Sequence, residues 1–471
     1  MSGLLITNAQ LGEAGTADVR IRGEQIAEIG SGLLARAGEK HIDAAGGALL
    51  PGLRDHHIHL MALAAARNSV CCGPPQVQDV ETLADRLRAA AVAERGPGRW
   101  LRGVGYHESV AGWLDRADLD RIVPDHKIRI QHRSGALWIL NSAALEALDV
   151  EPGAMPEGME RDGDGQPTGR LHRLDDWLRA RIATGEPPDL SAVGAELAAL
   201  GVTGLCDATA HNGASELAAL EAAIRSGALP QRLLVMGGAE LPPASHPRVR
   251  RHHRKLMLDE GHLPDPGELA DEIAAAHAAG RGVAFHCVTR SELVLALAAL
   301  EQAGPRPGDR VEHASVAPPD LVELLLDRGV RVVTQPGFLH SRGDAYLHDV
   351  EARDLPWLYR GRGFVEAGIP LAGSTDAPFG EPDPWAAMRA AVDRRSASGA
   401  SLCPDEALTP EQALALFTTP LDRPGDAPSR IECGAVADLC LLDRSWHAAR
   451  ETLDGRCVRI TIVGGEAVSG S

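Results

Sequence analysis

Both ends of the chain show short apolar runs in which hydrophobic and polar positions alternate. Such runs occupy residues 4–6, 17–21 and 26–29 near the start, and residues 437–442 and 458–463 near the end. A period of two is typical of short antiparallel strands. Neither end has enough strands for a core of its own. We therefore expect residues 1–48 and 431–471 to form one small composite β-sandwich domain.

Between these ends, apolar runs that read as buried strands alternate with segments of helical spacing. Helical spacing of apolar residues occurs at 191–199, 268–279, 292–302 and 319–328, and Thr409-Pro410 is typical of a helix start. The strand candidates are residues 49–57, 204–209, 232–238, 254–259, 283–287, 310–315, 331–335 and 369–375. Eight strands with intervening helices predict an α/β fold, a (β/α)8 TIM barrel over residues 49–430.

The stretch between the first and second predicted barrel strands is too long for a single helix. Residues from about 97 to 190 are therefore expected to be an insertion, with strand-like runs at 100–106 and 127–132 and a Gly/Asp-rich turn at 161–169. An insertion of this kind sits on a barrel loop, so we expect it to cap the site.

Candidate chemistry is concentrated at the end of the first predicted barrel strand, in Pro51-Gly52-Leu53-Arg54-Asp55-His56-His57-Ile58-His59. Side chains alternate faces along a strand, so His57 and His59 point the same way. Two neutral imidazoles at this spacing can reach one metal ion. A His-x-His pair alone is more often part of a polar loop. The buried strand before it, the Pro-Gly entry and Asp55 favour the metal site.

Further potential ligands close other predicted strands. Lys255 lies on the fourth strand, His286 ends the fifth, His313 ends the sixth and Asp376 ends the eighth. The carboxyl ends of barrel strands face a common mouth. We therefore expect these side chains to converge with the His-x-His pair around bound metal.

These motifs resemble those of the amidohydrolase superfamily, the metal-dependent (β/α)8-barrel hydrolases. The segment from Pro51 to His59 is similar to its first metal motif. The order His-x-His, Lys, His, His, Asp resembles that of binuclear members such as hydantoinases and dihydroorotases. The resemblance implies that Lys255 is carboxylated and bridges two ions. It also implies that one ion is held by His57, His59 and Asp376, and the other by His286 and His313. The alternative for Lys255 is a surface lysine, or an ordinary cation beside a single metal ion.

Other segments resemble amidohydrolase family 3, the group that includes the N-substituted formamide deformylases. They are residues 133–135 with Trp138, 141–145, 165–169, 201–203, 310–314, 334–336 and 374–378. Two departures stand out. A histidine common after Gly135 is replaced by Ala136, and the turn after His286 reads Cys287-Val288-Thr289-Arg290. Both departures affect substrate-facing loops, so they leave the substrate open.

The expected reaction is metal-assisted hydrolysis of a non-peptide C–N bond in an amide, formamide, carbamate or cyclic amide. Asp376 would act as general base and then general acid, and His340, after the seventh strand, would polarise the substrate carbonyl. Tyr106 and Trp138 are candidates for lining the pocket, although both are equally suited to a core. Arg290 is a candidate partner for a substrate carboxylate.

Two other functions remain open. A heterocycle deaminase on the same barrel usually works with one metal and a Glu shortly after the fifth-strand His, and Glu292, six residues after His286, matches that poorly. A catalytically inactive barrel could serve as a binding module, but no ligand position is lost. Metal content distinguishes these functions, because two ions indicate the hydrolase, one the deaminase and none the inactive scaffold.

Composition excludes several classes of function. The net charge of -18 argues against nucleic-acid binding, and 3% aromatic residues argue against a base-stacking surface. No apolar run approaches the ~20 residues of a membrane span. The start lacks signal-peptide features, and the eight Cys form no Cys-x-x-Cys pair.

We expect a cytoplasmic enzyme that acts on a small molecule with zinc and no organic cofactor. Manganese, cobalt or iron remain open as the metal, as does a homodimer.

Overall fold

The computed structural model describes residues 3–12, 15–94, 98–150, 155–182 and 187–470. The chain forms two compact units. The first contains Met1–Leu60 and Asp189–Ser471, and the second contains Met61–Pro188.

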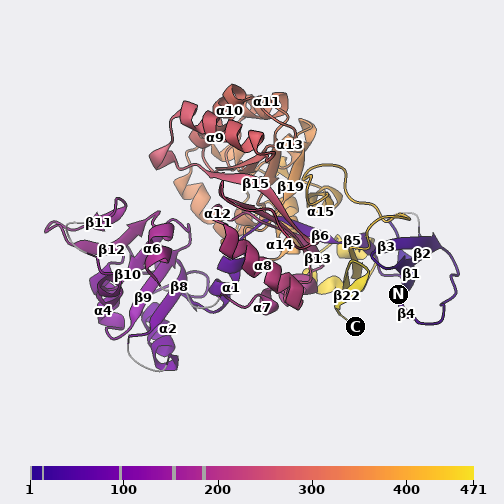
Figure 1. The fold of residues 1–471 in the computed structure, drawn as a ribbon, viewed down its shortest axis with the longest axis horizontal. Helices are drawn as coiled ribbons and strands as arrows, with labels where there is room; N and C mark the ends of the chain where they lie inside the picture. Colours follow the sequence, from indigo (N-terminus) through magenta and orange to yellow (C-terminus); the bar gives the residue numbers. More distant parts are fainter. Residues whose placement is uncertain (1–2, 13–14, 95–97, 151–154, 183–186, 471) are drawn as a thin grey trace. The chain divides into compact units, whose positions relative to one another are not determined.

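The centre of the first unit is an eight-stranded parallel sheet in which neighbours in sequence are neighbours in space (Figure 1). Beyond the last strand, the amide of Asp376 donates to the carbonyl of His57, and the amide of His59 donates to the carbonyl of Ala377, both at 2.9 Å. These bonds join the last strand region to the first strand, so the sheet is a nearly closed barrel. The predicted (β/α)8 fold is confirmed. The strands are β6 (Leu53–Ile58), β13 (Val202–Asp207), β14 (Arg232–Gly237), β15 (Val249–Met257), β16 (Val283–Cys287), β17 (Arg310–His313), β18 (Arg331–Thr334) and β19 (Leu371–Gly373).

Helices connect these strands, and the four expected from apolar spacing begin and end within two residues of their predicted bounds. Thr409 caps its helix as predicted, because its hydroxyl accepts from the amide of Gln412. The α-helices from Asp189 onwards are α7 (Ser191–Ala199), α8 (Ala214–Ser226), α9 (Pro266–Ala278), α10 (Arg290–Ala303), α11 (Pro319–Asp327), α12 (Gly337–Asp349), α13 (Arg362–Glu366), α14 (Pro384–Asp393), α15 (Pro410–Thr418) and α16 (Trp446–Ala449).

The first predicted barrel strand, residues 49–57, is two strands in the structure, which corrects the prediction. β5 (Leu49–Pro51) pairs with β20 (Leu439–Leu442) outside the barrel, and β6 begins at Leu53. Gly52 separates them, and a Cβ on it would lie 2.2 Å from the Thr203 side chain. The segment therefore contributes to two sheets, and glycine at the division lets β13 approach.

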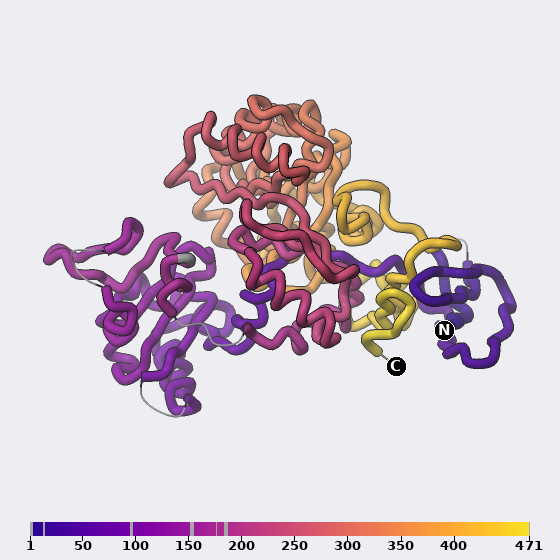
Figure 2. The backbone as a smooth tube through the Cα atoms, viewed as in Figure 1, coloured from indigo at the N-terminus to yellow at the C-terminus, as the bar shows by residue number. Residues whose placement is uncertain are grey.

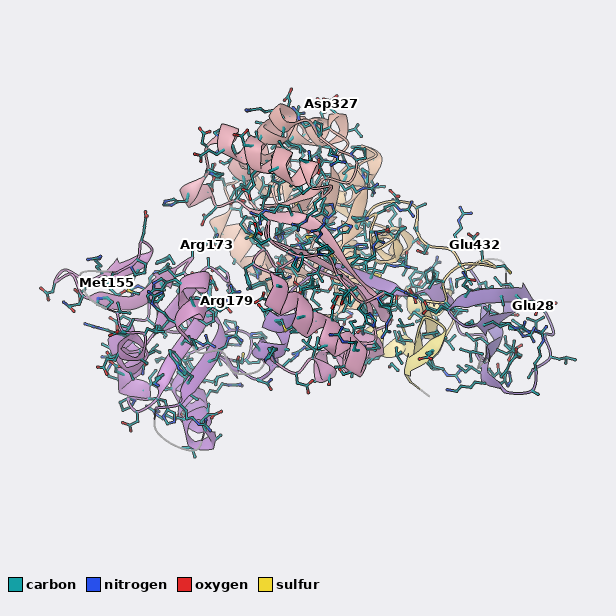
Figure 3. All side chains as sticks on the ribbon, viewed as in Figure 1. Glu28, Met155, Arg173, Arg179, Asp327 and Glu432 are labelled. Atoms are coloured by element: carbon teal, nitrogen blue, oxygen red, sulfur yellow. The ribbon has the colours of Figure 1, made fainter. Side chains whose placement is uncertain are left out.

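Both ends of the chain contribute to one hydrophobic core outside the barrel, where indigo and yellow segments of the tube meet (Figure 2). One sheet has the order β3-β2-β1-β4, and the other has the order β22-β21-β20-β5. Leu4 and Ile6 from the start share a buried cluster with Leu439 and Ile460 from the end. Figure 3 labels Glu28 and Glu432 in these end segments. The remaining strands are β1 (Gly3–Gln10), β2 (Thr16–Arg22), β3 (Gln25–Gly30), β4 (Glu39–Asp43), β21 (Val458–Val463) and β22 (Glu466–Ser469).

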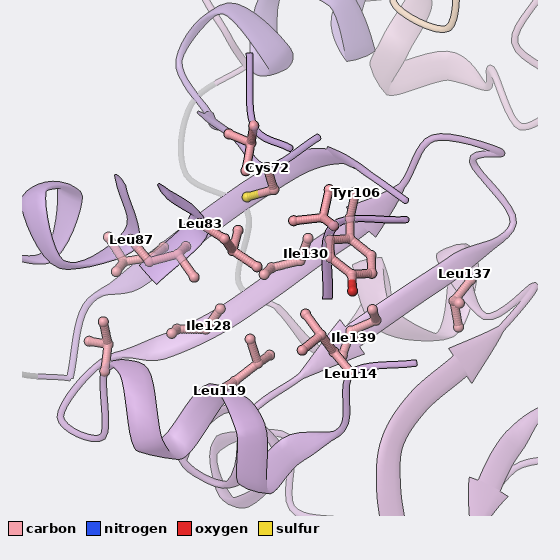
Figure 4. Packing of buried hydrophobic residues seen from close by; sticks show 14 residues of the cluster. Cys72, Leu83, Leu87, Tyr106, Leu114, Leu119, Ile128, Ile130, Leu137 and Ile139 are labelled. Carbon is pink, nitrogen blue, oxygen red and sulfur yellow. The ribbon is translucent and has the colours of Figure 1, made fainter. Parts of the chain in front are cut away.

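The second unit is built on a six-stranded sheet with the order β11-β12-β10-β9-β8-β7. One cluster contains Ile128 and Ile130 of β9 with Leu83 and Leu87 of α2 (Figure 4). The unit starts earlier than the expected insertion, because β7 pairs with β8 and α2 packs into the same cluster. Of the expected insertion, residues 97, 151–154 and 183–186 lie outside the described residues. Its elements are β7 (Val70–Cys71), α2 (Val80–Ala93), β8 (Trp100–Tyr106), α3 (Glu108–Ala111), α4 (Arg116–Ile122), β9 (Lys127–His132), β10 (Leu137–Leu140), α5 (Ser142–Ala147), β11 (Met159–Arg161), β12 (Pro167–His172) and α6 (Asp175–Arg181), and α1 (Leu60–Arg67) begins at the boundary.

Across the described residues, none of the helices combines the length and the apolar character that a membrane crossing requires.

Candidate metal centre

The carboxyl ends of the barrel strands bring the predicted histidines together. The ring centroids of His57 and His59 lie 5.2 Å apart, those of His57 and His313 5.0 Å, and those of His286 and His313 4.6 Å. Asp376 joins them from the segment after β19. Its Oδ1 lies 3.1 Å from Nε2 of His59 and 3.5 Å from Nε2 of His57. Side chains from four strand ends therefore share one small volume.

Hydrogen bonds on the far side of the rings fix how two of these imidazoles face the centre. Nδ1 of His57 donates to Glu312 at 2.5 Å, and Nδ1 of His313 donates to Oε1 of Gln335 at 2.7 Å. With the proton held on Nδ1, Nε2 of each ring carries a lone pair. His59 is anchored by Thr209, with 2.9 Å between Nδ1 and the hydroxyl. Partners of this kind orient metal-binding histidines in proteins.

Three buried polar atoms of this cluster have no hydrogen-bond partner among the described residues: Nζ of Lys255, Nε2 of His313 and Oδ1 of Asp376. Buried polar groups are almost always paired, because leaving one unpaired costs ~1–3 kcal/mol. Nε2 of His57 and Nε2 of His59 also lie within 3.5 Å of the carboxylate oxygen. The donor set of neutral imidazoles with a carboxylate suits a divalent metal ion. The residues present therefore fit a metal ion.

Burial sets the protonation of the cluster. It lowers the pKa of His57 to about 3 and that of His313 to about 4, with nearby Lys255 lowering both. It also lowers the pKa of His286 well below its usual value. Burial opposes ionisation of Asp376, but His57 and His59 outweigh it and keep the carboxyl pKa low. The cluster thus combines neutral imidazoles with an ionised carboxylate.

Lys255, in β15, is 3% exposed, and burial lowers the pKa of its ammonium group. Its charge interacts with those of Glu312 and Asp376. The lysine is therefore a member of the cluster and not a surface residue.

The backbone is in the left-handed region at two of the cluster residues, with φ of 70° at His313 and 55° at Asp376. In a regular strand, consecutive side chains point to opposite faces. Yet Glu312 and His313 both contact His57. The turn of the backbone at His313 lets both neighbours face the same ring. Such strain outside glycine is concentrated at functional sites.

Two buried carboxylates support the cluster without belonging to it. Asp55 was expected only as part of the metal motif, and Glu312 had no expected role. Glu312 forms an ion pair with Arg310, and both side chains are fully buried. Asp55 accepts from the amides of His57 at 3.2 Å and Thr375 at 3.1 Å. Burial raises the pKa of Asp55 to about 7. The only available signal was their position inside the Asp-x-His-x-His and Arg-x-Glu-His motifs.

The remaining predicted residues have other surroundings. His340 is exposed on the first turn of α12, directly after β18. Arg290 forms an ion pair with Asp354. The role of Arg290 as partner of a substrate carboxylate stays a prediction. The role of His340 in polarising a substrate carbonyl stays a prediction as well.

Tyr106 and Trp138 are both buried within the second unit. The hydroxyl of Tyr106 donates to the carbonyl of Gly112 at 2.6 Å, and its ring belongs to the core of Figure 4. The indole of Trp138 donates to Asp175 at 2.8 Å. These contacts correspond to the core role considered for both residues, and their contact with substrate stays a prediction.

Comparison with known proteins assigns this chain to a family. The model of the amidohydrolase family matches residues 40–469, nearly the whole chain. The chain belongs to the amidohydrolase family. As a member, it is a metal-dependent hydrolase that acts on carbon–nitrogen bonds other than peptide bonds.

Individual relatives agree with this assignment. The N-substituted formamide deformylase of Arthrobacter pascens is 26% identical over 86% of this chain and 84% of its own. The putative amidohydrolase YtcJ of Bacillus subtilis (strain 168) is 27% identical over 83% of each chain. An uncharacterized metal-dependent hydrolase from Pyrococcus horikoshii OT3 has the same fold, with a TM-score of 0.75, 22% identity and 99% of both chains covered.

Proposed function

We propose that this amidohydrolase binds divalent metal at the rim of its barrel and hydrolyses an amide, formamide, carbamate or cyclic amide of small size. The observation that carries the proposal is the convergence of Nε2 of His57 and Nε2 of His59 on Oδ1 of Asp376, at 3.5 and 3.1 Å. The proposed ligands are His57, His59, Lys255, His286, His313 and Asp376.

Lys255 would bridge two zinc ions as a carbamate. Burial lowers the pKa of the amine and so raises the share of its neutral form, and only a neutral amine adds to carbon dioxide. Nζ forms a bond to the carbon and loses one proton, which leaves an anionic carbamate. An ammonium group at this position would repel a divalent ion, so the uncarboxylated lysine is a poor ligand.

Asp376 would move the proton in the reaction. A bound divalent ion supplies Lewis-acid polarisation of the carbonyl and lowers the pKa of water towards ~7. Asp376 Oδ1 accepts a proton from the attacking water as its oxygen bonds to the carbonyl carbon. It then gives that proton to the leaving nitrogen as the C–N bond breaks. The low pKa of Asp376 keeps it ionised and ready to accept.

The substrate class is supported by the relatives. The similarity to a protein named N-substituted formamide deformylase over most of both chains makes N-substituted formamides the first compounds to test. No observation favours the deaminase. The carboxylate of Glu292 is already used, because it accepts from the amides of Val288, Thr289 and Glu260 at 2.6 to 3.1 Å.

The decisive experiment is an Asp376→Asn substitution in metal-loaded enzyme, assayed with N-substituted formamides, N-acyl amines and carbamates. General acid–base catalysis contributes about 10²- to 10⁴-fold, so we expect kcat to fall by that factor. Asp327→Asn is the matched control, because Asp327 ends α11 with an 82% exposed side chain (Figure 3). Full activity in Asp376→Asn would refute the proposal.

A further inference from the structure

A second group of potential ligands lies in the other unit, where the mechanism uses none of them. His132 ends β9, and His107 directly follows β8. These strands are parallel neighbours, with Tyr106 paired to His132, so their carboxyl ends meet at one edge of the sheet. Glu108 is the first residue of α3. The backbone thus places two imidazoles and one carboxylate at a single sheet edge.

The three side chains face one another. Nε2 of His107 lies 3.2 Å from Oε1 of Glu108, and Nε2 of His132 lies 3.1 Å from Oε2 of the same carboxylate. The two rings are stacked, with centroids 5.8 Å apart and 28° between their planes. One donor atom from each residue lies within 4.8 Å of the others. Ligands at ~2.1 Å from one ion lie no more than ~4.2 Å apart, so small side-chain rotations would close the set.

Both imidazole rings have hydrogen-bond partners of the same kind at Nδ1. Nδ1 of His107 is 2.8 Å from the hydroxyl of Ser109, and Nδ1 of His132 is 2.8 Å from the hydroxyl of Ser134. The backbone amide of each serine also lies 3.2 Å from the same Nδ1. The two His-x-Ser segments therefore hold their rings in the same way.

These partners at Nδ1 are compatible with either neutral tautomer of each ring. Without an ion, the serine amide donates to Nδ1 and Nε2–H of His132 donates to Glu108, with Nε2 of His107 3.2 Å from the same carboxylate. With an ion, the proton sits on Nδ1 and donates to the serine hydroxyl, which frees the Nε2 lone pair. Each ring keeps one proton throughout, so binding changes the tautomer and not the charge of the imidazole. A hydrogen bond from Nδ1 is the usual support of a histidine ligand.

We propose that His107, Glu108 and His132 form a second site for a divalent transition-metal ion. Two imidazoles and one carboxylate are a ligand set that zinc and its neighbours accept, with further positions open to water or another ligand. The site is reachable, because the side chains are 17%, 40% and 15% exposed, respectively.

The test measures zinc bound by the full-length chain in a background that removes the histidine ligands of both proposed barrel ions: His57→Gln, His59→Gln, His286→Gln and His313→Gln. We expect this chain to keep one equivalent of zinc that Glu108→Gln abolishes. The matched control is His172→Gln, because His172 lies 3.7 Å from Glu160 in the same unit and belongs to no group of three ligands among the described residues. It should leave zinc binding unchanged.

A second variant separates a metal site from a merely structural cluster. Ser134→Ala removes the hydroxyl behind His132, and loss of such a partner weakens metal affinity by about 10- to 100-fold. Circular dichroism checks that each variant is folded. The proposal is overturned if folded Glu108→Gln binds zinc with unchanged stoichiometry and affinity, since the three residues then do not hold the ion together. Loss of barrel zinc alone would affect the proposed function and not this site.

Discussion

Single residues behind the histidine rings decide how well the barrel centre can hold metal. The proposed ligands could be predicted from the sequence, because each lies on or directly after an apolar run that reads as a strand. The hydrogen-bond partners of these ligands could not be predicted from the sequence. Glu312, Gln335 and Thr209 come from three different strand ends, and their contacts depend on barrel register and on the backbone turn at His313. No local pattern in the sequence encodes those distances.

One such partner gives a direct prediction. Gln335→Met removes the acceptor of the His313 Nδ1–H bond while keeping a side chain of similar length. We expect metal affinity at the barrel centre to fall by about 10- to 100-fold, because the ring loses its orientation and tautomer control. Competition with a chromogenic chelator measures this.

Gln231→Met is the control for that substitution. Gln231 is as fully buried as Gln335, but its amide donates to the carbonyl of Gly194. It should lower stability without changing metal affinity. Equal affinities in both variants would show that Gln335 does not orient His313.

At the scale of elements, the period of the apolar residues was enough to predict the barrel strands and several helices, because each buries one regular face. The division of residues 49–57 between β5 and β6 was not predicted, since Pro51-Gly52 reads equally well as the entry to one continuous strand. Only the close approach of Thr203 to Gly52 reveals the boundary. Three-dimensional packing, and not local propensity, fixes this break.

Gly52→Ala tests that boundary. The added methyl group would overlap the Thr203 side chain, and overpacking costs about 1–3 kcal/mol, so the free energy of unfolding should fall by that amount. Thr203→Ala should restore part of the loss when combined with it, because two of the three clashing atoms disappear. Chemical denaturation measures both, and an unchanged midpoint in Gly52→Ala would contradict the packing described.

The connection between α8 and the segment before β15 gives a pH-dependent prediction. Burial alone would raise the pKa of Glu221, but hydrogen bonds from the hydroxyl and amide of Ser245 and the amide of His246 outweigh it and lower the pKa to about 2. A lowered pKa contributes stability that is full above the unfolded value of 4.5 and is lost as pH falls towards 2.

The stability difference between the wild type and Glu221→Gln should therefore shrink on acidification. We expect a decrease of about 1 kcal/mol between pH 7 and about 3.5, after allowing for solvent screening. Urea denaturation at both pH values measures it. Glu323→Gln, on the exposed face of α11, should show no such change. A constant difference for Glu221→Gln would mean that the hydrogen bonds do not lower its pKa.

At the scale of the whole molecule, each of the two units has a hydrophobic core of its own. The barrel could be predicted because eight strand signals fall in order. The extent of the second unit could not be predicted, because no pattern in residues 61–96 indicates which hydrophobic core they join. The contacts of Leu83 and Leu87 decide that question.

Separate cores imply separate responses to core mutations. Ile130→Ala, in the cluster of the second unit, should cost about 2–5 kcal/mol. Hydrogen exchange should accelerate in residues 61–188 and not in the barrel strands. Val235→Ala, at a fully buried position of β14, should produce the opposite pattern. Uniform acceleration by either variant would show that the units unfold together.

The near-closure of the barrel by β6 and the segment after β19 also has a consequence for synthesis on the ribosome. β6 is complete at Ile58, but β19 begins only at Leu371. At ~5–20 residues per second, the nascent chain waits roughly 15–60 s for that partner. The second unit, complete at Pro188, can fold during translation, whereas His57 gains its neighbours His313 and Asp376 only late. We therefore expect metal loading to follow chain completion.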